Sequence, residues 1–204
     1  MNIIERVKNI LISPKKEWDV IATEEQSLST VLTTYVVPLS LIGALATLIG
    51  WGLIGKSYGG FGLDWTVKGW DIGIKYAIIS LVSVILGFLI TTFVVDMLAP
   101  SFGSEKNLNK SAQFVAYSYT PSLVAGVLNI LPSLALLVMI AGLYSIYLMY
   151  LGLGPVKKTP DDKKVVYLVI SIVVLIAAYF VLGLILVSVL GLGTMGATNH
   201  ITVG

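Results

Sequence analysis

Residues 76–98 read YAIISLVSVILGFLITTFVVDML, a run of 23 residues in which Asp96 is the only charged side chain. A helix needs about 20 mainly apolar residues to cross the hydrocarbon layer of a membrane. The sequence therefore predicts an all-α, polytopic membrane protein. Four further apolar runs give it five transmembrane helices, at residues 31–54, 108–131, 132–153 and 165–192.

The composition agrees with this class and excludes several others. Of the 204 residues, 56% are apolar and 12% are charged, whereas soluble domains carry about 25% charged residues. The net charge of +2 is too small to indicate nucleic-acid binding. The chain has no cysteine, and its one histidine is His200, near the C-terminus. We therefore predict no catalytic residues, no cofactor and no metal site, and hence no enzyme.

The basic residues decide between five crossings and four. With a cytoplasmic N-terminus and five crossings, ten of the thirteen Lys and Arg residues lie inside and three lie outside. If the polar third run did not cross, six would lie inside and seven outside. Short cytoplasmic loops are enriched in Lys and Arg. The pattern thus predicts a multi-pass protein of the cytoplasmic (inner) membrane, with its N-terminus in the cytoplasm and its C-terminus external.

Three regions follow from this topology. Residues 1–30 are predicted as cytoplasmic interfacial helices, 31–192 as the five-helix transmembrane domain, and 193–204 as a mobile external tail. No cleavable signal peptide is expected, because the N-terminal residues contain no apolar stretch that ends at a small-residue cleavage site.

A short amphipathic helix is predicted at residues 1–12. Its apolar side chains recur at helical spacing, so it either lies in the membrane interface or packs on the protein's own cytoplasmic face. Tryptophan concentrates at membrane interfaces. The predicted interfacial anchors are therefore Trp18, Trp51 and Trp70.

The first predicted span carries two packing signals. Pro38 lacks an amide hydrogen, so the carbonyl of Thr34 loses its helical partner and a kink is expected. Small residues spaced four apart allow another helix to approach closely. They form two pairs, Gly43 with Thr47 and Ala46 with Gly50.

The candidate polar site combines Asp96 with one face of the third span. Gln113, Tyr117 and Thr120 fall at i, i+4 and i+7, and Pro121 leaves the carbonyl of Tyr117 without its helical donor. This face could form the wall of a solute path or a partner site. It could equally bond neighbouring helices together. Asp96 could serve ions or protons, be solvated at the interface, or cap another helix.

Several short motifs resemble one family when they are taken in their order along the chain. They are Pro14-x-x-x-Trp18, Tyr35-Val36-Val37-Pro38-Leu39, Ala116-Tyr117-Ser118-Tyr119-Thr120-Pro121, Asn129-Ile130-Leu131-Pro132, and Gly142-Leu143-Tyr144-Ser145-x-Tyr147-Leu148-x-Tyr150-Leu151-Gly152-Leu153 followed by a basic loop. Over roughly residues 10–190 the chain resembles the prokaryotic branch of the Yip (Ypt/Rab-interacting) membrane-protein family.

The resemblance implies five transmembrane helices with a cytoplasmic N-terminus, and it implies no catalytic residues. Eukaryotic relatives resemble adaptors for small GTPases. This chain lacks their long cytoplasmic N-terminal region, so GTPase binding is not transferred to it.

Two functions remain open at this point. The first is a non-enzymatic membrane protein that binds membrane-protein or lipid partners, including the bilayer itself or a second copy of the chain. Its recognition surface would be the third and fourth spans with the 154–164 loop. The alternative is a small transporter or channel for an ion or small solute, which would use Asp96 and the polar face of the third span.

Overall fold

The computed structural model describes residues 2–60 and 63–189, so the predicted tail lies outside the described residues. The described part is helical apart from one hairpin, which confirms the all-α class. The elements are α1 (Ile3–Ile12), α2 (Pro14–Thr23), α3 (Leu28–Val31), η1 (Leu32–Val36), α4 (Val37–Ile49), η2 (Gly50–Ile54), β1 (Lys56–Gly60), β2 (Leu63–Val67), α5 (Trp70–Leu98), η3 (Ala99–Phe102), α6 (Leu108–Ser118), α7 (Thr120–Ala125), η4 (Gly126–Ile130), η5 (Pro132–Leu134), α8 (Ala135–Lys157) and α9 (Lys164–Val189).

Four helical stretches in the described residues are long and apolar enough to cross a membrane. They are Leu28–Ile54, Trp70–Phe102, Leu136–Lys157 and Lys164–Ile185. The third predicted crossing is not one continuous helix, because it is divided into α6, α7 and the 3-10 turn η4. An integral membrane protein is thus confirmed, whereas the count of five spans is not.

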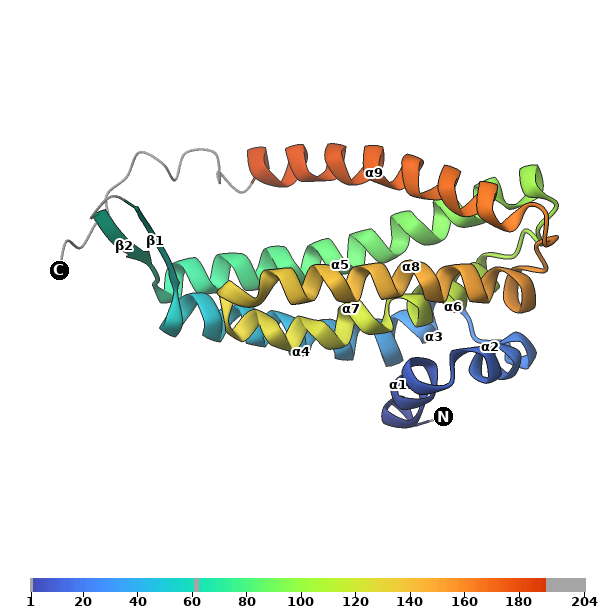
Figure 1. Ribbon diagram of the computed structural model, residues 1–204, viewed down its shortest axis with the longest axis horizontal. Helices are drawn as coiled ribbons and strands as arrows, with labels where there is room; N and C mark the ends of the chain where they lie inside the picture. Colours follow the sequence, from blue (N-terminus) through green and yellow to red (C-terminus); the bar gives the residue numbers. More distant parts are fainter. Residues whose placement is uncertain (1, 61–62, 190–204) are drawn as a thin grey trace.

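Successive segments run in alternating directions between two ends of the molecule (Figure 1). The α3–η2 stretch runs away from α1 and α2, α5 returns, α6–η4 runs out beside α8, α8 returns, and α9 runs out again. The β1–β2 hairpin lies at the far end, which we call the hairpin end, and the opposite end is the basic end. Ten basic residues belong to the elements and loops of the basic end: Arg6, Lys8, Lys15, Lys16, Lys106, Lys110, Lys157, Lys158, Lys163 and Lys164.

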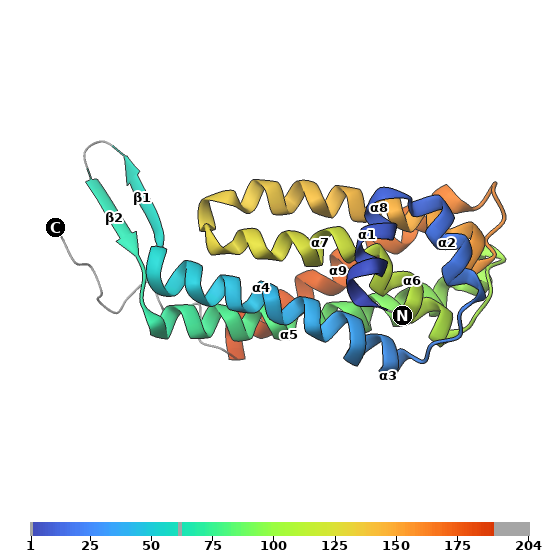
Figure 2. The same cartoon turned by 90° about the horizontal axis from the view of Figure 1, so that it is seen from below.

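The first span has a π turn where its sequence predicts a kink, and it has a close helix contact at one of its predicted small residues. The helix widens into the π turn η1 just before Pro38, and the amide of Val37 there donates to the carbonyl of Leu32. Gly43 lies directly on Gly126 of η4, since a Cβ built on Gly43 would be 3.5 Å from the Cα of Gly126. The α4 helix therefore lies close against η4 (Figure 2).

The α1 and α2 helices form a cap on the basic end of the bundle. Ile10 and Ile21 are fully buried in the core, and Tyr144 of α8 donates to the carbonyl of Leu11 at 3.0 Å. Of the two placements expected for α1, the structure therefore has the helix packed on the protein itself. Trp18 is fully buried against Phe114, so its ring contacts protein and the interfacial-anchor prediction is wrong for it. The physical reason is that Gly152 has no side chain to exclude the indole.

The strands β1 and β2 pair antiparallel, with Ser57 opposite Thr66. The other two predicted anchors lie next to these strands. Trp51 stacks on Tyr76 with ring centroids 4.6 Å apart, and Trp70 is 54% exposed. Their anchoring role stays a prediction.

Candidate functional site

Asp96 lies in a buried polar cluster near the basic end, where α5, α6 and α8 meet. Ser111 donates to the Asp96 carboxylate at 2.8 Å, and the Lys157 ammonium donates to the Ser111 hydroxyl at 2.6 Å. The Lys157 Nζ is also 3.6 Å from Asp96 Oδ1. The side chain of Lys157 is fully buried and that of Asp96 is 11% exposed. Asp96 therefore joins three helices through its paired charge.

The same end is reinforced by contacts between its loops. Tyr167 of α9 donates to the carbonyl of Val95 and stacks on Phe102. The amide of Glu105 donates to the carbonyl of Lys157 at 2.8 Å. The Lys158 ammonium lies 2.6 Å from the Glu105 carboxylate and lowers the pKa of that carboxyl. The start of α9 is thus tied to α5 and η3, and the loop that contains Glu105 is tied to the C-terminal end of α8.

A second buried cluster joins the α1–α2 cap to α6. Arg6 is fully buried and is paired with Glu17 of α2 and with Glu24. Its guanidinium lies 4.9 Å from the centroid of the Tyr117 ring. The Lys110 ammonium donates to the carbonyl of Glu24 at 2.7 Å, and a cation is favourable at the C-terminal end of a helix such as α2. The cap is thus attached by charge as well as by apolar contact.

Tyr117 and Thr120 come together with the first span, as the predicted shared face requires. The hydroxyls of Tyr35 and Thr120 are 2.7 Å apart, and Thr120 donates to the carbonyl of Tyr117 at 2.7 Å. The expectation of an unpaired carbonyl beside Pro121 is therefore wrong. The hydroxyl of Thr120 replaces the amide hydrogen that Pro121 lacks, and the helix breaks at Tyr119 between α6 and α7.

Gln113, the third residue of that face, is fully buried on α6. Neither atom of its amide group has a hydrogen-bond partner among the described residues. A buried amide without partners is costly, and such groups in native proteins are usually bonded to protein or to water. Gln113 is therefore the one candidate whose polar atoms the described helices do not use.

The candidate residues do not form one site. Asp96 belongs to the Lys157 cluster, whereas Tyr117 and Thr120 belong to the Arg6 cluster. The sequence analysis singled out neither Lys157, which falls in the predicted 154–164 loop, nor Arg6, which falls in the predicted amphipathic helix at residues 1–12. Lys157 could have been found from the predicted topology, since that topology puts Asp96 and Lys157 at the same end of neighbouring spans.

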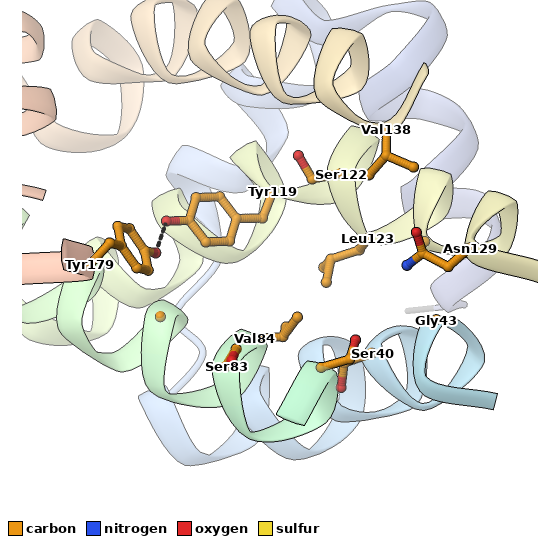
Figure 3. A pocket seen from close by; sticks show the side chains of 13 residues that line it. Ser40, Gly43, Ser83, Val84, Tyr119, Ser122, Leu123, Asn129, Val138 and Tyr179 are labelled. Carbon is orange, nitrogen blue, oxygen red and sulfur yellow. Dashed lines mark hydrogen bonds between the residues drawn. The ribbon is translucent and has the colours of Figure 1, made fainter. Parts of the chain in front are cut away.

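A cavity of about 330 Å³ lies apart from both clusters. It is bounded by α4, α5, α7, η4 and the start of α8, and Tyr179 reaches it from α9 (Figure 3). Its polar lining comes from hydroxyl groups and one amide, and none of the predicted site residues lines it. The lining residues are Ser40, Gly43, Ser80, Ser83, Val84, Gly87, Tyr119, Ser122, Leu123, Gly126, Asn129, Val138 and Tyr179.

The two buried clusters carry charged side chains, whereas the described lining of the cavity carries none. The buried charges are paired with one another, and the described residues contain no group of three or more His, Asp or Glu that could hold a metal ion. What remains is a polar framework inside an apolar bundle, together with an uncharged cavity.

Comparison with known proteins gives a family and two relatives. The Yip1 domain matches residues 8–185. Inner membrane protein YohC of Escherichia coli K12 is 25% identical over 155 residues, which cover 74% of this chain and 77% of YohC. YohC of Escherichia coli O6:H1 strain CFT073 gives the same values. No solved structure matches the chain significantly.

Proposed function

This chain belongs to the Yip1 domain family, and from that premise we propose that it is a non-enzymatic membrane protein that binds membrane-protein or lipid partners. Yip1-family membrane proteins are not known as enzymes. The observation that supports the proposal is the role that Asp96 has in the structure. Its carboxylate bonds Ser111 and faces Lys157, so it joins helices and does not line the cavity.

The proposed recognition surface is the outer face of α7, η4 and α8 with the 154–164 segment. Its centre is apolar, since Met139 and Leu143 lie one turn apart on α8 and are 60% and 61% exposed. Its edge is charged, because the side chain of Lys158 is 74% exposed. A membrane-embedded apolar face beside a cytoplasmic basic loop could bind another membrane protein or a second copy of this chain.

We place this surface in the inner membrane with the basic end in the cytoplasm. YohC is an inner membrane protein, and ten of the thirteen basic residues belong to the basic end. This distribution favours a cytoplasmic N-terminus. It also favours five crossings, with the broken segment α6–η4 as the third. A broken helix is tolerated at membrane depth where neighbouring helices and hydroxyl groups satisfy its backbone, as Thr120 does here.

Site-specific photocrosslinking in intact cells tests the proposal. A benzophenone amino acid at position 143 should give a discrete adduct of higher mass, identified by mass spectrometry. The same group at position 176 of α9 is the matched control, because Ile176 is 65% exposed but lies outside the surface. A monomer band alone at both positions would contradict partner binding at this face.

A small transporter or channel is the alternative function, and one observation favours it. The cavity lies beside the helix break at Tyr119, and transporters often place their sites where helices are interrupted. Ion or solute flux into liposomes that contain the purified protein, lost in a folded Ser83→Phe variant that fills the cavity, would support this alternative. Equal flux in liposomes with and without the protein would exclude it.

A further inference from the structure

The cavity offers hydrogen bonds that the protein does not use. Among the described residues, the side chains of Ser80, Ser83 and Asn129 line it without a hydrogen-bond partner. Ser80 and Ser83 belong to α5 and Asn129 belongs to η4, and Figure 3 shows Ser83 and Asn129 on different walls of the cavity. Hydroxyl and amide groups each provide both donors and acceptors. A ligand that carries a hydroxyl or carbonyl group would form hydrogen bonds with these side chains.

The lining also sets the charge of that ligand. Within the described part of the chain, no charged side chain lines the cavity. Most of the lining is apolar, from residues such as Val84, Leu123 and Val138. An ionised ligand would therefore lie buried without a counter-charge, which is strongly unfavourable. The cavity selects for an uncharged molecule with a small polar group.

The depth of the cavity points to the bilayer as the source of the ligand. Gly87 is 11 residues from the C-terminal end of α5 and 17 from its N-terminal end. At a rise of about 1.5 Å per residue, it lies about 16 Å and 25 Å from the two ends. A charged headgroup at that depth would be costly, whereas an uncharged lipid can reach it. A volume of about 330 Å³ is at the lower end for ligand sites, so it would hold a head and the first part of a chain.

Tyr179 forms the side of the cavity that faces the bilayer. It is 37% exposed, and its hydroxyl is 2.9 Å from that of Tyr119 and 3.0 Å from that of Thr91. Its ring fits against α5 only because Gly87 has no side chain, since a Cβ there would be 2.8 Å from the Tyr179 hydroxyl. The Tyr179 ring therefore lies where the cavity borders the bilayer.

We propose that this cavity binds an uncharged lipid with a hydroxyl-bearing head, such as a diacylglycerol. The head bonds Ser80, Ser83 and Asn129, and the acyl chains leave past Tyr179 into the bilayer. This inference rests on the proposed function, of which it specifies the lipid partner. It places that lipid at a site separate from the α7–α8 surface.

Photolabelling of the full chain in nanodiscs tests the proposal. The probe is a diacylglycerol that carries a diazirine near its glycerol end, and the comparison probe is a phosphatidylglycerol with the same chain. Ser83→Phe fills the cavity, and Val82→Phe adds the same ring at a neighbouring position that does not line it. Asn129→Leu keeps the size of the side chain and removes its amide.

We expect the diacylglycerol probe to label the peptide that contains Ser80 and Gly87. Labelling should fall at least tenfold in Ser83→Phe, fall severalfold in Asn129→Leu, and stay unchanged in Val82→Phe. Equal labelling in Ser83→Phe and Val82→Phe, or equal labelling of the cavity by both probes, would overturn the proposal. Undiminished labelling of Asn129→Leu would also overturn the proposal. This variant provides the test if Ser83→Phe does not fold. The position-143 adduct reports on protein partners separately, so either result can fail alone.

Discussion

The clearest energetic prediction concerns the pair formed by Asp96 and Lys157. Asp96→Asn removes the carboxylate and leaves a fully buried ammonium group, whereas Lys157→Met removes the ammonium and leaves a carboxylate that still accepts from Ser111. The Asp96 side chain retains 11% exposure, so its charge keeps some solvation. Asp96→Asn should therefore be the more damaging change.

The separation of the two charges gives the magnitude. At 3.6 Å, with an effective dielectric constant of about 20, two unit charges attract by about 4.6 kcal/mol. Removing one partner of a buried pair typically costs about 3–5 kcal/mol. We expect a loss of that size in the free energy of unfolding for Asp96→Asn, and about 1–3 kcal/mol for Lys157→Met. The double variant should lie within about 2 kcal/mol of wild type, because no unpaired charge remains.

Unfolding by sodium dodecyl sulfate from mild detergent micelles, followed by tryptophan fluorescence, measures these differences. Asp162→Asn is the matched control, since that carboxylate is exposed in a loop and its change should be within about 0.5 kcal/mol. Equal losses for the two single variants would refute the proposed asymmetry. A double variant whose loss equals the sum of the single losses would show that the two charges do not interact.

Three further predictions concern packing, the cap and pH. Gly50→Ala places a methyl group against a backbone oxygen of η4 and should cost about 1–3 kcal/mol of unfolding free energy, whereas Gly183→Ala, which meets nothing within 4 Å, should stay near wild type. Arg6→Met leaves the carboxylates of Glu17 and Glu24 without their ion-pair partner, so the α1–α2 cap should become sensitive to limited proteolysis. Lys8→Met, on the exposed face of α1, should not have this effect. Glu105→Gln should reduce stability slightly at pH 7. Because the pKa of the Glu105 carboxyl is lowered in the folded state, this difference should shrink as pH falls below about 4.5 and vanish below the folded pKa, and a difference that grows on acidification would contradict it.

The architecture could be predicted where it depends on local pattern. The run 76–98 lies within α5, because an apolar run of that length is most stable as a membrane-spanning helix. A π turn lies just before Pro38, which acts on the helix through its missing amide hydrogen. The small residue Gly43 lies at a close helix contact, because it lets the backbones approach. The break at Tyr119 followed from Pro121 and the polar residues around it.

The candidate site could be predicted only in part. Burial of a charge depends on partners that other elements bring, so the pattern of α1 alone does not reveal that Arg6 is buried beside Glu17 and Glu24. Trp18 is buried because Gly152 of α8 lies opposite, which no local pattern reveals. The cavity likewise arises from residues of six elements, α4, α5, α7, η4, α8 and α9, together with Tyr119, and no local pattern in any one of them reveals it.

The orientation and the recognition surface both depend on whether α6–η4 crosses the membrane, and one labelling experiment decides this. The chain has no cysteine, so Asp162→Cys in the exposed α8–α9 loop gives a single reactive thiol. Ser57→Cys in the hairpin and Asp19→Cys in the cap mark the two sides. With a maleimide that cannot cross the inner membrane, five crossings predict that position 57 is labelled in intact cells while positions 19 and 162 are protected until the cells are lysed. Labelling of position 162 in intact cells, with position 19 still protected, would contradict five crossings.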